Sequence, residues 1–254
     1  MEIEVDLAKS AQDNANDYFY KSKRAKRKKE GAEQSVRELE KKLEDAEQRL
    51  QKIEKKKIKV IAKREWYEKF HWFFASNAML AVGGRDAAQN ELINSRHFEE
   101  KDLFFHADIF GASVVVLKNG IDASREVKEE VAQFAACYSS AWKEGQTTVN
   151  VYSLKREQVT KSKSGGSLGT GAFAMSGERE WFKNVKLELV AFIADGRLNV
   201  VPGKTAEVTK AQGLHITLGD AKKSDAAKLI SKRLGYDDID YVMQQFPTGG
   251  FKIK

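Results

Sequence analysis

The sequence predicts an α+β protein: a long N-terminal coiled-coil helix followed by a mixed α/β domain with antiparallel hairpins. Three observations support this fold class. A heptad pattern of apolar residues runs along the first 60 positions, strand-like and helix-like segments alternate after it, and Asp195-Gly196 separates two apolar runs as a hairpin turn would. We expect a helical arm over residues 1–64 and a domain over 65–254.

The arm is predicted from its apolar spacing. Intervals of three and four residues separate Val36, Leu39, Leu43, Ala46, Leu50, Ile53 and Val60, and counting back by sevens adds Tyr18, Ala25 and Ala32. Ser10 and Asp13 form a capping-box pattern, and no proline precedes Pro202. One helix from about 11 to 62 would be roughly 75 Å long. Its apolar seam needs a partner, which is a second copy of the chain, another helix or a larger assembly.

The positive charge is concentrated in this arm. The chain has 44 Lys and Arg against 37 Asp and Glu, and residues 1–65 hold 19 of the bases and 14 of the acids. Seven of nine consecutive positions are basic: Lys21, Lys23, Arg24, Lys26, Arg27, Lys28 and Lys29. Such a run is either a solvated helix face or a binding site for phosphates.

The domain begins with an aromatic cluster over residues 66–74, a density typical of a core. Spacing and turn signals then predict the following elements. They are a strand at 79–82, a helix capped by Asp86 and ending near Arg96, strands at 102–109 and 113–118, a helix at 123–143, a strand at 149–159, a hairpin of 187–193 with 197–201, a strand at 214–218, and a helix at 224–234.

Several functional classes are excluded by composition. The single Cys137 forms no intramolecular disulfide, indicates a reducing cytoplasmic compartment, and is expected to be a packed apolar side chain. No apolar stretch is long enough to span a membrane. Gly203-Lys204-Thr205 resembles the end of a phosphate-binding Walker loop, but Leu198 stands where its first glycine belongs, and we expect a hairpin end there.

A candidate polar site surrounds His106. His106 and Asp108 are two positions apart on a predicted strand and therefore share a face, which suits either a structural hydrogen bond or acid–base chemistry. An RNA-directed enzyme would require Arg85 and Asp86 to join them, with Asn90 and Ser113 completing the polar site. The four His residues lack metal-ligand spacing, so we predict no metal and no cofactor.

The segment 161–171 is the better candidate for ligand contact. It contains Lys161, Lys163, four hydroxyl residues and four glycines, and no acid. Backbone amides, hydroxyls and ammonium groups are donors to phosphate oxygens, and glycine permits close approach. A flexible linker would have a similar composition.

Several motifs resemble the NFACT-R domain. They are Trp66 to Phe73, Gly83-Gly84-Arg85-Asp86-Ala87-Ala88-Gln89-Asn90-Glu91, Phe105 to Ser113, Ser140-Ala141-Trp142 and Thr160 to Gly177. Upstream, Ser10 to Ala15 with Tyr18-Phe19 resembles the coiled-coil segment that precedes this domain in RqcH- and NEMF-type ribosome quality-control factors. The resemblance covers nearly the whole chain and is weaker after about residue 200.

The resemblance implies a non-catalytic RNA-binding module whose partners are the large ribosomal subunit rRNA and tRNA. The implied RNA contacts are the seven basic arm residues with Arg85, Lys118, Lys161, Lys163, Ser164, Ser167 and Thr170. The NFACT-N and helix-hairpin-helix regions of the family have no match in this sequence, so we expect a fragment or a naturally short relative. The resemblance therefore does not predict that this chain alone extends a stalled nascent chain. The alternatives are an RNA-modifying or RNA-processing enzyme and a coiled-coil scaffold with a protein partner.

Overall fold

A computed structural model describes residues 3–61, 65–163 and 166–254, with the backbone alone described over 47–61, 162–163 and 166–167. The chain divides into two compact units, Met1–Lys63 and Arg64–Lys254. Each unit is described by itself below. No helix in the described part of the chain is both long enough and apolar enough to cross a membrane.

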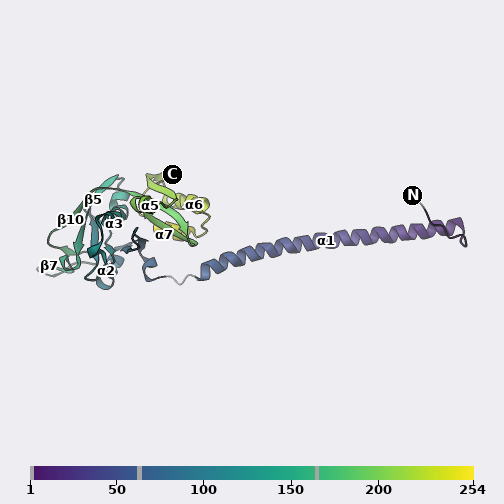
Figure 1. Ribbon diagram of the computed structural model, residues 1–254, viewed down its shortest axis with the longest axis horizontal. Coiled ribbons are helices and arrows are strands. Elements are labelled where there is room, and N and C mark those ends of the chain that lie inside the picture. The colour runs from purple at the N-terminus through teal and green to yellow at the C-terminus, as the bar shows by residue number, and fades with distance from the viewer. Residues whose placement is uncertain (1–2, 62–64, 164–165) are drawn as a thin grey trace. The chain divides into compact units, whose positions relative to one another are not determined.

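The first unit is built on one helix, α1 (Ala11–Ile61) (Figure 1). Its start follows the predicted cap, because the Ser10 hydroxyl accepts a hydrogen bond from the Asp13 amide at 3.1 Å. The Asp13 carboxylate in turn accepts from that hydroxyl at 2.5 Å, where the full capping box would have it bind the Ser10 amide. The predicted single helix is therefore confirmed to within a residue at its C-terminal end.

The apolar seam of α1 is exposed to solvent. Tyr18 is 41% exposed, Val36 52%, and both Leu39 and Leu43 63%. The side chains of Leu50, Ile53 and Val60, predicted to continue the seam, lie outside the described residues. The described seam residues thus remain available to a partner helix.

The second unit begins with a six-stranded antiparallel sheet in the order β1-β2-β4-β3-β5-β10. Its strands are β1 (His71–Phe74), β2 (Leu80–Gly83), β3 (Leu103–Ala107), β4 (Val115–Leu117), β5 (Thr148–Lys155) and β10 (Glu180–Lys186). Strands β2, β3, β4 and β5 fall within or beside the predicted ranges, whereas β1 and β10 were not predicted.

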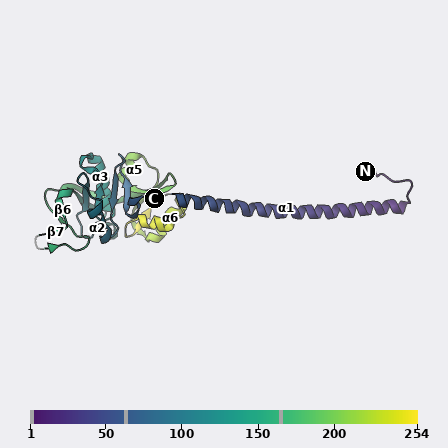
Figure 2. The same ribbon diagram turned by 90° about the horizontal axis from the view of Figure 1, so that it is seen from below.

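Helices cover the two faces of this sheet. Helix α3 (Arg125–Cys137) packs on one face through Val131 and Phe134, and α2 (Ala87–Arg96) packs on the other through Ile93 (Figure 2). Helix α2 starts as predicted, because the Asp86 carboxylate accepts from the Gln89 amide at 2.8 Å.

A second antiparallel sheet has the order β12-β11-β13-β14 and carries the C-terminal helices (Figure 1). Its elements are β11 (Glu188–Ala194), β12 (Arg197–Pro202), α5 (Gly203–Thr209), β13 (Leu214–Ala221), α6 (Lys223–Leu234), α7 (Ile239–Gln245) and β14 (Phe251–Ile253). The hairpin across Asp195-Gly196 is confirmed: both residues have positive φ, 50° and 70°, as a type I′ turn requires. Residues of both sheets share one core with α3, which makes them a single domain.

Short elements fill the connections. They are the 3-10 helices η1 (Trp66–Lys69), η2 (Gly120–Asp122) and η3 (Arg156–Gln158), helix α4 (Ser140–Lys143), and strands β6 (Val159–Thr160), β7 (Ser162–Lys163), β8 (Gly166–Ser167) and β9 (Ala174–Met175). Strand β6 pairs with β9, and β7 pairs with β8. The predicted strand 149–159 therefore ends early, at Lys155.

Two expectations differ from the structure. The helix predicted over 123–143 breaks at Tyr138, because the Ser139 hydroxyl accepts from the Ala141 amide at 3.3 Å and starts α4. The aromatic cluster is only half core: Phe70 and Phe73 are buried, whereas Trp66 and Phe74 are 41% and 43% exposed.

Candidate nucleic-acid interface

The basic cluster of the arm lies on α1 with all seven side chains exposed. Nine helical residues make two and a half turns, so the cations project on every side of the helix. Their internal contacts are slight: Lys29 lies 3.9 Å from Glu33, and Lys21 lies over the Tyr18 ring. These ammonium and guanidinium groups therefore face water, where phosphates are accessible to them.

The predicted phosphate contact Arg85 serves the fold. Its Nη2 donates to the Phe70 carbonyl at 3.0 Å and, more weakly, to the Glu68 carbonyl, and its Nη1 contacts Gln244 in α7 at 3.4 Å. The guanidinium thus ties the loop after β2 to the start of β1 and to the C-terminal helices. These bonds use the donor groups that a phosphate would need.

Lys118 is likewise committed to internal contacts. Its Nζ lies 2.6 Å from the Asp102 carboxylate and donates to the His97 carbonyl at 3.0 Å. The Asp102 side chain is fully buried and also accepts from the amides of Glu99 and Asn119, each at 2.8 Å. Lys118 therefore neutralises a buried carboxylate.

Lys161 anchors the glycine-rich segment. Its Nζ pairs with Glu91 of α2 and donates to the Gly169 carbonyl at 2.8 Å. The same Glu91 oxygen accepts from the Gly171 amide at 3.1 Å, and these hydrogen bonds lower the pKa of the Glu91 carboxyl. Gly171 has φ of +75°, and a Cβ there would meet Ala87 at 2.8 Å. The base of the segment is thus fixed to α2.

The remaining predicted contacts of this segment are described only in part. Thr170 is exposed. The backbone of Lys163 pairs with that of Gly166, and Ser167 pairs with Ser162. The side chains of Lys163 and Ser167, and the whole of Ser164, lie outside the described residues.

Asp86 and Asn90 of the predicted polar site lie at α2, and Ser113 lies just before β4. Asp86 caps α2, while the Asn90 side-chain oxygen accepts from the Val114 amide at 3.2 Å. Gly84 passes so close that a Cβ there would lie 2.0 Å from that Asn90 oxygen, which explains the glycine at this position. Ser113 is half-buried. The His106 ring is hydrogen-bonded to the backbone of Ala112, next to Ser113, whereas Asp86 and Asn90 bind the backbone amides of Gln89 and Val114.

His106 lies in an aromatic setting. Its Nδ1 is 3.3 Å from the Tyr152 hydroxyl, which in turn donates to the Met175 sulfur at 2.9 Å. Burial lowers the pKa of His106, partly offset by hydrogen bonds to the ring and by the Asp108 carboxylate. Strand β3 ends at Ala107, so Asp108 lies just beyond it, exposed, with its amide bonded to the Asn150 carbonyl at 2.7 Å.

The Gly203-Lys204-Thr205 segment lies at the end of the β11–β12 hairpin, as predicted. It begins helix α5 directly after β12, so the context is strand followed by helix without a loop. Lys204 pairs with Glu129, and the Thr205 hydroxyl donates to the buried Glu130 at 2.8 Å. Both side chains therefore join α5 to α3.

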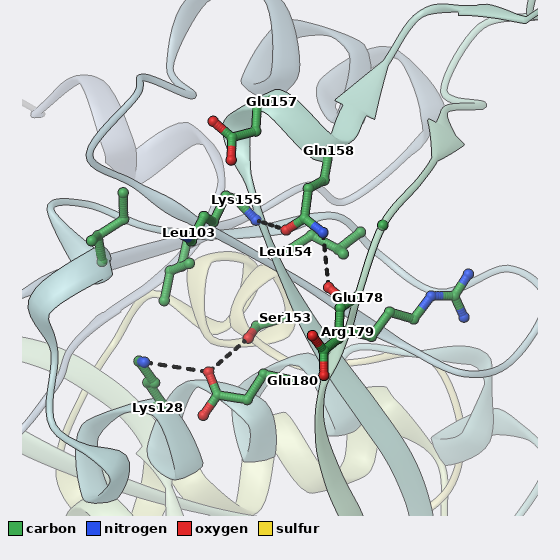
Figure 3. A pocket seen from close by; sticks show the side chains of 12 residues that line it. Leu103, Lys128, Ser153, Leu154, Lys155, Glu157, Gln158, Glu178, Arg179 and Glu180 are labelled. Atoms are coloured by element: carbon green, nitrogen blue, oxygen red, sulfur yellow. Dashed lines mark hydrogen bonds and ion pairs between the residues drawn. The ribbon is translucent and has the colours of Figure 1, made fainter.

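A hollow of about 640 Å³ opens beside β5 and the start of β10 (Figure 3). Its lining contains three bases, Lys128, Lys155 and Arg179, and three acids, Glu157, Glu178 and Glu180. Glu180 lies 3.3 Å from Lys128 and accepts from the Ser153 hydroxyl at 3.3 Å. The balanced charge makes this hollow a poor phosphate site.

Sequence reasoning missed three residues at β10: Arg179, which is half-buried and immediately precedes the strand, and the exposed Trp181 and Lys183. Arg179, Trp181 and Lys183 alternate in the sequence with Glu180 and Phe182. Trp181 is 36% exposed, and the Arg179 guanidinium lies 4.3 Å from the centre of the Tyr152 ring. Because Trp181 and Phe182 are adjacent, polar and apolar residues do not alternate here, and the sequence gives no clear strand signal.

Cys137 is buried against the Glu188 carbonyl, and burial raises the pKa of its thiol. Among the described residues, no three His, Cys, Asp or Glu side chains are grouped so as to hold a metal ion.

The geometry thus defines an antiparallel α+β domain and a separate helical unit with exposed basic residues. Comparison with protein families names the domain: residues 69–177 match the NFACT protein RNA binding domain. The chain belongs to the NFACT family.

Relatives share much of this chain. The archaeal Rqc2 homolog aRqcH of Methanocaldococcus jannaschii is 35% identical over 206 residues, which cover 78% of this chain and 30% of the relative. The ribosome quality control complex subunit NEMF homolog of Drosophila melanogaster is 37% identical over 197 residues, covering 74% and 19%. Subunit NEMF of Homo sapiens is 33% identical over 175 residues, covering 66% and 16%. The chain therefore spans less than a third of each of these relatives.

Proposed function

We propose that this chain is a non-catalytic RNA-binding module of cytoplasmic ribosome quality control that contacts the large ribosomal subunit rRNA and tRNA. The observation that carries the proposal is the exposed basic cluster Lys21 to Lys29 on α1. The family match and the names of the relatives support it.

The chemistry of the arm suits RNA. Each phosphate that a Lys or Arg neutralises releases bound counterions, so affinity falls as salt rises. A cluster that presents cations all around a helix recognises the phosphate backbone without requiring one orientation. We therefore propose that the arm binds RNA phosphates electrostatically and does not recognise the base sequence.

Within the domain, we propose different roles for the predicted contacts. Thr170 is accessible for an RNA contact, and we retain Lys163, Ser164 and Ser167 as candidates beside it. Arg85, Lys118 and Lys161 hold the framework, because their donor groups already bind internal carbonyls and carboxylates.

Filter binding to tRNA and to large ribosomal subunits across a salt series tests the proposal. We expect affinity to fall steeply between roughly 50 and 200 mM salt. An affinity that does not change over this range would exclude electrostatic RNA binding.

A second role is favoured by the exposed seam of α1. Val36, Leu39 and Leu43 are each more than half exposed, which fits association with a second copy or another helix. Light scattering of the wild type and of Leu43→Lys tests self-association. If the wild type is monomeric at every concentration measured, a second copy is excluded, and another helix or a larger assembly is the partner.

A further inference from the structure

Strand β10 presents a strip of alternating cationic and aromatic side chains. Arg179 immediately precedes the strand and lies beside Trp181, two positions further on, while Lys183 lies at the bulge that interrupts the pairing of β10 with β5 between Phe182 and Val185. We call these three residues the Trp181 strip. The alternate residues turn to the other face, where Phe182 is buried and Glu180 pairs with Lys128; Figure 3 shows Arg179 and Glu180 pointing in opposite directions.

The strip lies at an open margin of the domain. Strand β10 is the last strand of the six-stranded sheet, paired only with β5 on its inner side. Trp181 is 36% exposed, and Lys183 is exposed with no side-chain partner in the described part of the chain. A ligand can therefore reach both the ring and the ammonium group.

The strip rests on a row of rings that fixes its geometry. Trp181, Tyr152 and His106 are register partners across β10, β5 and β3. The Trp181 and Tyr152 rings meet edge to face with centroids 5.3 Å apart, and Tyr152 is only 4% exposed. Because Tyr152 is held by His106 and Met175, it supports Trp181 as a rigid base.

Arg179 extends this row. Its guanidinium carbon lies 4.3 Å from the centre of the Tyr152 ring and 5.8 Å from that of Trp181. A guanidinium held in this way keeps its charge available while offering a planar surface. The strip thus places an exposed aromatic ring between two cations.

We propose that the Trp181 strip binds an unpaired segment of RNA: one base stacks on Trp181, and the flanking phosphates contact Arg179 and Lys183. Aromatic platforms flanked by cations are how proteins hold single strands, because every base has a face that stacks. Bases inside a duplex are already stacked and do not offer that face. This inference rests on the proposed RNA binding and adds the class of RNA that the domain selects.

Fluorescence anisotropy of the full chain with a single-stranded 12-mer and with a duplex of the same sequence tests it. We expect Trp181→Ala to weaken single-strand binding about 5- to 150-fold, with duplex binding and the salt dependence unchanged. Lys183→Gln should instead reduce the salt slope for the single strand by about 0.7, the value for one lost phosphate contact.

Matched variants control for general effects. Trp66→Ala removes another exposed ring, 41% exposed, and Lys252→Gln removes an exposed cation on β14, an edge strand of the other sheet. Neither should alter single-strand binding. Arg179→Lys keeps the charge and loses the planar group, so we expect a several-fold loss of single-strand affinity at an unchanged salt slope. This variant tests the inference even if Trp181→Ala does not fold.

Single-strand affinity that is unchanged in both Trp181→Ala and Arg179→Lys would overturn the inference. An equal loss for single strand and duplex would do the same, because stacking on an unpaired base would not be the cause. If the wild type binds neither probe nor tRNA, the proposed function fails as a whole, which is a distinct outcome.

Discussion

The basic residues of the arm and those predicted as RNA contacts in the domain differ in their internal contacts. In the arm, Lys21 to Lys29 are exposed and nearly free of internal partners. In the domain, Arg85, Lys118 and Lys161 were predicted as similar contacts, yet each is bonded to carbonyls or carboxylates of the fold. The same residue types therefore do different work in the two units.

The difference arises because a single helix and a folded domain offer a charged side chain different neighbours. A single helix offers a cation only neighbours three or four positions away, so a run with few acids stays unpaired. A folded sheet brings together distant chain segments, as Asp102 meets Lys118 and Glu91 meets Lys161. A basic residue in a domain can therefore be assigned as a ligand contact only when the structure shows that it is not already paired within the fold.

The largest expected effect concerns Lys118, whose removal should damage the fold and not RNA affinity. Lys118→Met leaves the buried Asp102 carboxylate without its counter-charge, which costs about 3 kcal/mol of unfolding free energy. Denaturant unfolding followed by tryptophan fluorescence measures this, because all four Trp residues lie in the domain. The double variant Lys118→Met with Asp102→Asn should recover part of the loss. Unchanged stability with weakened RNA binding would reverse the assignment.

The next effect concerns the arm. Replacing Lys26, Arg27 and Lys28 by Gln should weaken tRNA binding roughly tenfold or more and reduce the salt slope by about 2 to 3, with the domain's stability unchanged. Replacing Lys41 and Lys42 by Gln is the control on the same helix, since both are exposed and lie outside the cluster. A larger loss from the control pair would mean that overall charge matters and the cluster does not.

The helical arm was predictable from sequence because its signal is local: heptad spacing, the Ser10 cap and the absence of proline act within one or two turns. The turn at Asp195-Gly196 and the cap at Asp86 are local for the same reason. Strand β1 was not predicted because its rings belong to the aromatic cluster 66–74, which was interpreted as core. Strand β10 was not predicted because the adjacent Trp181 and Phe182 interrupt the alternation of polar and apolar residues.

The candidate site was less predictable, since the partners of its cations are distant in sequence. Lys161 and Glu91 are 70 positions apart, and no spacing rule connects them. The local composition of 161–171 predicted phosphate contact, and it gave no sign that Lys161 pairs with Glu91 of α2. Internal neutralisation of this kind is a property of tertiary structure.

Acid should weaken the domain, which holds all four His residues, and not the arm. Burial keeps the pKa of His71 well below its usual value, helped by the nearby positive charges of Arg85 and Lys223. The unfolded chain takes up a proton below about pH 6.5 and the folded chain does not, so stability falls as pH drops from that value. One such group contributes at most about 1.4 kcal/mol per pH unit.

Unfolding of wild type and His71→Phe at pH 7.5, 6.5 and 5.5 measures this contribution. The wild type should lose more stability than the variant between pH 6.5 and 5.5. The residual slope of the variant should reflect His106 and His97, because burial lowers the pKa of both. Parallel pH profiles would show that His71 does not titrate differently in the two states.

The smallest expected effect is that of Glu91→Gln on RNA affinity. Its direction shows whether Lys161 positions the segment or binds phosphate. Glu91→Gln removes the counter-charge of Lys161 but keeps an oxygen that can accept from the Gly171 amide. If Lys161 only positions the segment, RNA binding weakens about two- to threefold at an unchanged salt slope, and amide exchange quickens over 168–173 alone; this is the result we expect. If Lys161 binds phosphate, loss of its competitor frees an ammonium group, and affinity rises with a steeper slope. Glu100→Gln, an exposed acid beyond α2, makes the same charge change without touching the segment, so any effect that it shares with Glu91→Gln is long-range electrostatics.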